Sequence, residues 1–186
     1  MIRVKVCGLM TERDLETCID AGVHALGFVA DHPEPVPWNL TRSEAAHLIS
    51  KVPPFACSCV VTGGNPDDVA ETAMSIRPHV LQLHHRETLD DILRVVERLK
   101  PEGIRVIKAL RIRADGLCDF EIEDPGEAAR VLSKTGLSGI LVDSFTEDKP
   151  GGTGITVDLD TFISVKVNST VPVILAGGLN PGNIGG

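Results

Sequence analysis

The sequence has 186 residues, of which 42% are hydrophobic and 24% are charged, so a largely disordered chain is excluded and one globular domain with a sizeable core is expected. The formal net charge of −8 argues against a general nucleic-acid-binding surface, and no apolar run has the length of a transmembrane helix. An anionic small molecule is compatible with this charge, because backbone amides and helix N-termini can form a local anion site on an acidic protein.

Aromatic residues make up only 3% of the chain and tyrosine is absent, so the core must be built from Val, Ile, Leu and Ala. This composition suits buried parallel strands and covering helices better than an aromatic-rich β-sandwich. The cysteines are odd in number, and no signal-peptide pattern precedes the first strand-like run, so we expect reduced thiols and a cytoplasmic protein. Cys57 and Cys59 would share one side of a strand, and we expect core cysteines there rather than metal ligands.

Short runs rich in β-branched residues alternate with amphipathic stretches along the chain. The runs that predict strands are Ile2–Val6, Ala25–Val29, Ala56–Val61, Val80–Leu83, Arg105–Ala109, Gly139–Val142 and Val173–Leu175. The stretches that predict helices are Thr11–Ala21, Arg42–Lys51, Pro66–Ile76, Thr88–Leu99, Asp124–Thr135 and Asp158–Val165. This alternation indicates parallel strand pairing with right-handed crossovers.

Short motifs predict where several of these helices begin and end. Thr11 and Asn65 have the positions of N-caps, and Asn65 is followed by a proline and two aspartates that suit a first helical turn. Gly22, Gly103 and Gly136 fall just past helical segments, where a glycine in the left-handed conformation is favoured.

The predicted strands recur about every 25 to 30 residues, a spacing that fits both a doubly wound sheet and a (β/α)8 barrel. No Gly-x-Gly-x-x-Gly follows the first strand, which removes the usual sign of a dinucleotide-binding fold. We therefore predict the α/β class and a (β/α)8 TIM barrel, with residues 1–186 forming a single domain that ends after the seventh strand.

Polar and glycine-rich segments follow the predicted strands at their carboxyl ends. These segments are Cys7-Gly8, Thr62-Gly63-Gly64, Asp143-Ser144, Gly151-Gly152-Thr153-Gly154 and Gly177-Gly178. Barrel enzymes place their active sites at this face, so the clustering predicts a site there.

Cys7 and Asp143 are the candidate acid–base residues. A thiolate at the end of the first strand, favoured by nearby helix N-termini, would be a good base or nucleophile, and a buried apolar cysteine is the alternative. A partly buried carboxyl group at the end of the sixth strand would serve as a proton donor, and a turn or helix cap is the alternative.

The glycine segments 150–154 and 176–178 would let backbone N–H groups approach phosphate oxygens closely. Phosphate sites recur near the last strands of barrels, although a merely flexible loop is the alternative for either segment alone.

Two pairs of basic side chains follow other strands. His84 and His85 come after the fourth strand, and as neighbours they point to opposite sides, so we do not expect them to bind one metal together. One of them can line the site, and a solvated turn is the alternative. Arg111 and Arg113 come after the fifth strand. They can attract an anion, and ordinary surface arginines are the alternative.

Together these segments resemble the phosphoribosylanthranilate isomerase family, from Met1 to the end of the chain. The motifs that carry the resemblance are Val4-Lys5-Val6-Cys7-Gly8-Leu9, Leu81-Gln82-Leu83-His84, Val142-Asp143, Gly151-Gly152-Thr153-Gly154 with Asp158, and Leu175-Ala176-Gly177-Gly178-Leu179-Asn180-Pro181. The resemblance implies an isomerase of tryptophan biosynthesis. Its reaction is an Amadori rearrangement of the aminoaldose N-(5-phosphoribosyl)anthranilate to the aminoketose 1-(2-carboxyphenylamino)-1-deoxyribulose 5-phosphate.

The resemblance also implies a role for each motif. Cys7 would be the general base that removes the C2 proton of the sugar, and Asp143 would be the general acid that protonates the ring oxygen and opens the furanose. The residues expected to bind the substrate or its phosphate are Gln82, His84, Gly151, Gly152, Gly154, Asp158, Gly177 and Gly178. The chemistry requires no metal or organic cofactor, and we expect a monomer or homodimer that binds neither nucleic acid nor membranes.

The sequence departs from the family pattern in several places. Met10 replaces the usual threonine, and His85 stands where the family usually has glycine. The family's Ser-Pro-Arg, whose arginine holds the anthranilate carboxylate, has no clean match in residues 31–39, although Arg42 lies a few residues later. The family continues through an eighth strand that carries part of the phosphate site, so we expect a fragment of a longer protein, or else a chain completed by oligomerisation.

Two other functions fit parts of this pattern. The aminoaldose isomerase of histidine biosynthesis performs the same rearrangement, but it would be expected to use paired aspartates and an internal twofold repeat, and Cys7 argues against it. A truncated barrel that binds phosphosugars or a partner chain without turnover is the non-enzymatic alternative.

Overall fold

The computed structural model describes residues 2–145 and 156–184. The chain divides into two compact units: the first comprises residues 1–87 and 94–106, and the second comprises residues 88–93 and 107–186. Helix α4 (Leu89–Leu99) has residues in both units. No helix within the described ranges is both long and apolar enough to cross a membrane.

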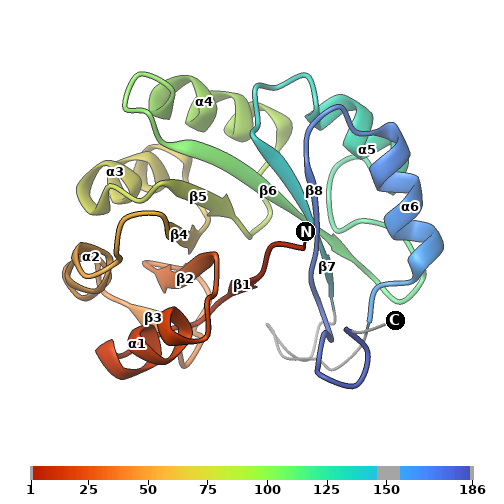
Figure 1. Cartoon of the computed structure of the whole chain (residues 1–186). Helices are drawn as coiled ribbons and strands as arrows, with labels where there is room; N and C mark the ends of the chain where they lie inside the picture. Colours follow the sequence, from red (N-terminus) through yellow and green to blue (C-terminus); the bar gives the residue numbers. More distant parts are fainter. Residues whose placement is uncertain (1, 146–155, 185–186) are drawn as a thin grey trace. The chain divides into compact units, whose positions relative to one another are not determined.

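The first unit contains parallel strands connected by helices (Figure 1). Its strands are β1 (Lys5–Val6), β2 (Ala25–Ala30), β3 (Asn39–Leu40), β4 (Cys57–Thr62) and β5 (Val80–Leu83). Its helices are α1 (Glu12–Asp20), α2 (Arg42–Ser50) and α3 (Pro66–Ile76). Strand β2 pairs in parallel with β1, β3 and β4, and β4 pairs in parallel with β5.

The strands of the first unit form its core. Leu26, Phe28, Val60, Leu81 and Leu83 are completely buried, and nearly every residue along β2 and β4 is buried as well. Strands that are buried on both faces are typical of parallel sheets covered by helices. The continuous apolar runs of the sequence are therefore the buried strands of this unit.

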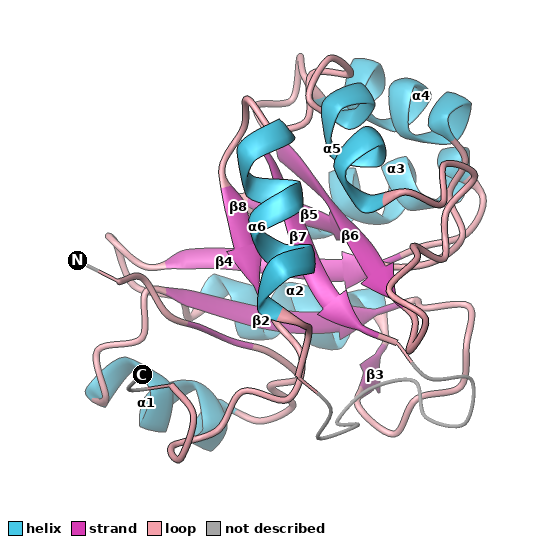
Figure 2. Ribbon diagram, turned by 90° about the vertical axis from the view of Figure 1, so that its right-hand side faces the viewer, coloured by secondary structure: helices cyan, strands magenta, loops and turns pink. Residues whose placement is uncertain are grey.

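The second unit repeats the same arrangement with three strands. These are β6 (Arg105–Ile112, of which the first two residues belong to the first unit), β7 (Gly139–Ser144) and β8 (Val173–Leu175), with helices α5 (Pro125–Leu132) and α6 (Leu159–Asn168). Strand β7 pairs in parallel with both β6 and β8. Figure 2 shows α5 and α6 lying next to each other. They approach closely at Gly126, where a Cβ atom would lie 2.8 Å from Oγ of Ser164.

Most predicted elements are present, but the bounds of several differ and one strand is additional. Strand β1 is shorter than predicted, and the short strand β3 was not predicted. Strands β6 and β7 run further than predicted, to Ile112 and Ser144, so that Arg111 and Asp143 lie within strands rather than after them. The pairing of β7 with β6 up to the Ile112–Ser144 pair explains this extension.

The predicted helix caps are largely confirmed. Thr11 and Asn65 are the N-caps of α1 and α3, and Gly22 follows the C-cap of α1 with φ of 74°. Gly103 and Gly136 also have positive φ, but they lie in the turns beyond α4 and α5 rather than directly after the helix ends.

The N-cap of α1 provides a test of how local sequence stabilises this fold. Oγ1 of Thr11 accepts a hydrogen bond from the backbone N–H of Asp14 at 3.1 Å, and the Asp14 carboxylate accepts one from the N–H of Thr11 at 3.0 Å. Replacing Thr11 by alanine should lower the free energy of unfolding by about 1 kcal/mol, because one N-terminal amide loses its acceptor. Urea unfolding measures this change, with the exposed Glu16→Ala in the same helix as the control. Equal losses in both variants would contradict the capping role.

Candidate active site

Cys7 directly follows β1 and lies against the neighbouring strand β2. The backbone N–H groups of Gly8 and Leu9 both donate to the carbonyl oxygen of Gly27 at 3.0 Å. A Cβ atom on Gly27 would lie only 2.8 Å from Sγ of Cys7 and 3.0 Å from its Cα, so only glycine allows this approach. The Cys7 thiol is solvent-exposed, and the alternative of a buried apolar cysteine is therefore wrong.

The other cysteines have environments that disfavour a thiolate. Cys59 and Cys118 are buried, and desolvation raises the pKa of each thiol to about 12. Burial also raises the pKa of Cys57 and of Cys18, which are both partly exposed. The prediction of a core cysteine is confirmed for Cys59, whereas Cys57 is only half-buried.

Gln82 and His84 meet at the carboxyl end of β5. Gln82 is almost completely buried, and its Nε2 donates a hydrogen bond to Nδ1 of His84 at 2.9 Å. The backbone N–H of His84 donates to the carbonyl oxygen of Thr62 at 2.9 Å, which continues the β4–β5 pairing past the strand end. Both predicted substrate-binding residues are thus held together in the first unit.

Two histidines that follow different strands lie close together in the first unit, and the sequence did not predict this. The rings of His32, which follows β2, and His85, which follows β5, are edge to face with centroids 6.0 Å apart. Nδ1 of His85 lies 3.4 Å from a carboxylate oxygen of Glu34. Gly63 makes room for this arrangement, because a Cβ there would lie 2.3 Å from Cβ of His85. Within the described residues, no group of histidine, cysteine and acidic side chains has the arrangement of a metal site.

Asp143 and the glycine turn after β8 meet in the second unit. Asp143 is half-buried near the end of β7. A Cβ atom on Gly177 would lie 2.5 Å from Oγ of Ser144, 2.6 Å from its backbone nitrogen and 2.8 Å from Oδ1 of Asp143. Gly177 and Gly178 have φ of 81° and 63°, a left-handed conformation that favours glycine. The structure thus places this turn directly against the candidate acid.

The other predicted phosphate ligands differ in position. Asp158 is exposed and is the N-cap of α6, where its carboxylate accepts a hydrogen bond from the N–H of Thr161 at 3.2 Å. Its local role is therefore helix capping, and phosphate binding by Asp158 stays a prediction. Gly151, Gly152 and Gly154 lie outside the described residues.

Comparison with known proteins shows which family this chain belongs to. A family model described as N-(5'phosphoribosyl)anthranilate (PRA) isomerase matches residues 4–186. The chain belongs to this family. The N-(5'-phosphoribosyl)anthranilate isomerase of Natronomonas pharaonis is 35% identical over 185 residues, which cover 99% of this chain and 80% of that protein. The protein of the same name from Geotalea uraniireducens is 36% identical with the same coverage.

Solved structures of the phosphoribosylanthranilate isomerase family have the same fold. The enzyme from Thermotoga maritima matches with a TM-score of 0.78 and 26% identity, covering 99% of this chain and 80% of that one. A further family structure, in complex with reduced 1-(o-carboxyphenylamino)-1-deoxyribulose 5-phosphate, matches with a TM-score of 0.73 and 25% identity, covering 98% and 79%. The predicted α/β barrel class is confirmed by these matches.

Arg42 was considered from the sequence as a replacement for the anthranilate-binding arginine of the phosphoribosylanthranilate isomerase family. In the structure its Nε contacts the carboxylate of Asp31, and its Nη1 donates to Glu71 at 3.2 Å. The hydrogen bond with Asp31 raises the pKa of the Arg42 guanidinium. Arg42 is therefore already paired with two carboxylates, and this geometry does not favour it as a ligand for a third.

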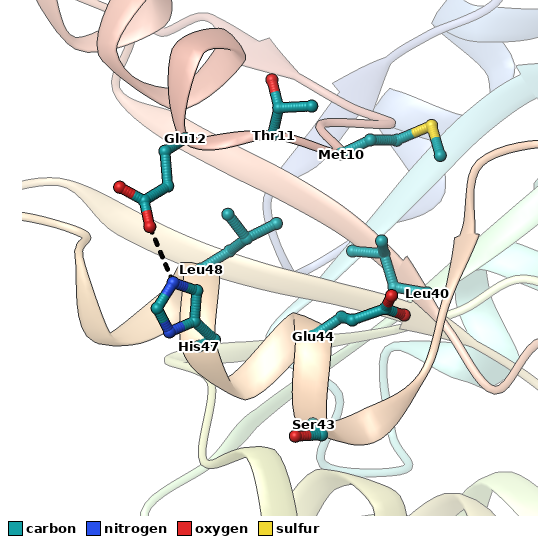
Figure 3. A pocket seen from close by; sticks show the side chains of 8 residues that line it. All are labelled: Met10, Thr11, Glu12, Leu40, Ser43, Glu44, His47 and Leu48. Carbon is teal, nitrogen blue, oxygen red and sulfur yellow. Dashed lines mark hydrogen bonds and ion pairs between the residues drawn. The ribbon is translucent and has the colours of Figure 1, made fainter.

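A pocket of about 430 Å³ lies between α1 and α2 (Figure 3). The residues that line it are Met10, Thr11, Glu12, Leu40, Ser43, Glu44, His47 and Leu48. His47 lies 2.7 Å from Glu12 and holds the pKa of that carboxyl below its usual value. Two carboxylates in the lining make this pocket unsuitable for an anionic phosphosugar.

The difference between the cysteines predicts a selective thiol reaction. At pH 8 iodoacetamide should alkylate Cys7 well before Cys59 or Cys118, because Cys7 is exposed while the other two are buried with a pKa of about 12 and hold almost no thiolate. Mass spectrometry of peptides from the native and the urea-unfolded protein measures the order. Early labelling of Cys59 in the native protein would contradict this assignment.

The close approach at Gly177 predicts a loss of stability on substitution. Gly177→Ala should lower the melting temperature more than Gly116→Ala, because both have positive φ near 80° but only Gly177 would place a Cβ against backbone and side-chain atoms. Both glycines lie in the second unit, so Gly116→Ala measures the conformational cost alone. Equal shifts would show that the turn is not packed against Ser144.

Proposed function

We propose that this chain isomerises N-(5'-phosphoribosyl)anthranilate to 1-(2-carboxyphenylamino)-1-deoxyribulose 5-phosphate. The observation that carries the proposal is the match of the phosphoribosylanthranilate isomerase family model to residues 4–186. A related structure that covers 98% of this chain binds the reduced form of this aminoketose, which supports a phosphosugar carrying an aryl carboxylate as the ligand class.

The proposed reaction moves protons only, and it needs one donor and one acceptor. Asp143 protonates the ring oxygen, so that the bond from this oxygen to C1 breaks and a protonated imine forms between C1 and the aryl nitrogen. Cys7, as thiolate, then takes the proton from C2, and the electron pair of the broken C2–H bond forms the C1–C2 double bond of an enolamine. Transfer of the C2 hydroxyl proton to C1 gives the aminoketose, and no oxidant or metal enters this balance.

The surroundings of the two residues suit these roles. The Cys7 thiol is exposed and held at a strand end by the contact with Gly27, so a substrate can reach it. Asp143 is half-buried against Gly177, so its carboxyl group lies beside the glycine turn proposed to bind the phosphate.

The phosphate is proposed to bind at the glycine turn that follows β8. Gly177 and Gly178 have no side chains and positive φ, which lets backbone N–H groups approach phosphate oxygens closely. The five free cysteines support a reducing compartment, and we propose the cytoplasm as the location.

Two substitutions test the acid and the base. Cys7→Ala and Asp143→Asn should each reduce turnover by about 100- to 10,000-fold, because each removes one proton-transfer group. The loss of fluorescence of the anthranilate substrate measures the rate.

Cys18→Ala and Asp160→Asn are the matched controls, since both side chains lie on helices and should leave turnover unchanged. Undiminished turnover in the Cys7 and Asp143 variants would overturn the roles. A wild-type chain that binds the reduced product without turnover would favour the non-enzymatic alternative.

A further inference from the structure

Arg111 is an unusual cation because it is buried within strand β6. Only 5% of the residue is exposed, and two contacts hold its guanidinium in place. Nη2 contacts the carboxylate of Asp119, which lies in the segment after β6, and Cζ lies 4.6 Å from the centroid of the Phe145 ring. A planar guanidinium stacked on a ring and paired at one nitrogen is fixed in orientation.

One donor of this buried guanidinium lacks an acceptor. Nε of Arg111 is buried and forms no hydrogen bond to any residue in the part of the chain that the structure describes. Leaving a charged donor unpaired in the interior is costly, and native proteins rarely do so without a ligand or water in that place. The fold therefore leaves part of the hydrogen-bonding capacity of this guanidinium unused.

The position of Arg111 in the sheet indicates which part of a ligand it would meet. The β6–β7 register pairs Arg111 with Asp143, and paired residues of parallel strands point to the same face. Gly177, after β8, packs against Asp143 from the other flank. At this edge of the second unit the order is therefore Arg111, Asp143 and Gly177, with the candidate acid in the middle.

The proposed substrate has its groups in a matching order. Its ring oxygen is bonded to C4, which carries the phosphate-bearing carbon, and to C1, which carries the arylamine. A substrate whose ring oxygen meets Asp143 and whose phosphate meets the turn at Gly177 thus directs its aryl group toward Arg111. We propose that Arg111 binds the carboxylate on this aryl group through its guanidinium group, an inference that rests on the proposed function.

The chemistry of the group suits this role. Arginine presents planar donors that match a carboxylate, and it stays charged at all physiological pH values. Arg113, two residues further on, differs because it is partly exposed and bonded to Asp115, Glu123 and the carbonyl oxygen of Cys118. Arg113 is therefore the matched control for the loss of a guanidinium near the same strand end.

The test compares two ligands that differ only in the carboxylate. The first is reduced 1-(2-carboxyphenylamino)-1-deoxyribulose 5-phosphate, and the second is its phenylamino counterpart, with binding measured by calorimetry. The wild-type chain should bind the first about 10- to 100-fold more tightly. Arg111→Met should remove this preference while leaving the affinity for the second nearly unchanged, and Arg113→Met should retain the preference.

Arg111→Lys guards against a folding defect, because it keeps a cation for Asp119 but lacks the planar guanidinium. It should melt near the wild-type temperature and also lose most of the preference. Equal weakening of both ligands by the Arg111 variants would show a structural role only, and an unchanged preference would place the carboxylate elsewhere. A wild-type chain that binds neither ligand would instead overturn the proposed function itself.

Discussion

The parallel register of β6, β7 and β8 is the constraint on which the candidate site of the second unit depends. Backbone hydrogen bonds continue past the strand ends, from the N–H of Phe145 to the carbonyl oxygen of Ile112 at 2.7 Å and from the N–H of Ala176 to that of Val142 at 2.8 Å. The register is therefore held where the polar residues begin. A slip by one residue would turn Asp143 to the opposite face and separate it from Arg111 and the glycine turn.

A second constraint is the absence of a side chain at three positions beside polar or reactive groups. A Cβ would meet Sγ of Cys7 if placed on Gly27, Cβ of His85 if placed on Gly63, and the backbone of Ser144 if placed on Gly177. In each case the polar or reactive residue packs directly on the backbone of the glycine, which belongs to a neighbouring strand or to the segment that follows one. This close packing restricts where the neighbouring polar group can lie.

Local sequence signals were sufficient for most of the fold and for part of the site. Hydrophobic periodicity, the N-cap at Thr11 and the strand-end positions of Cys7 and Asp143 depend on residues close together in the chain, and the structure contains the corresponding elements. The short β3 exists only through its pairing with β2. The ion pair of Arg42 with Asp31 joins residues from different segments, so its geometry could not be obtained from periodicity.

The burial of Arg111 illustrates the same limit in the second unit. The sequence placed this arginine after the fifth predicted strand, where a surface position is usual. Pairing with β7 extends β6 to Ile112, and this extension brings Arg111 into the sheet beside Asp143. The burial of the guanidinium follows from strand pairing and from the contacts with Asp119 and Phe145, which are tertiary features.

An acidic chain that binds a substrate with two anionic groups must recognise them locally. Two of the guanidinium groups considered from the sequence are unsuited to this, since Arg42 is paired with Asp31 and Arg113 with Glu123. The groups proposed for this recognition are the backbone of a glycine turn and the guanidinium of Arg111. The neutral turn suits a tetrahedral phosphate, whereas the planar guanidinium suits a planar carboxylate. Because hydrogen bonds to charged groups are stronger in a partly buried site, such donors can bind the substrate although the net charge of the chain is −8.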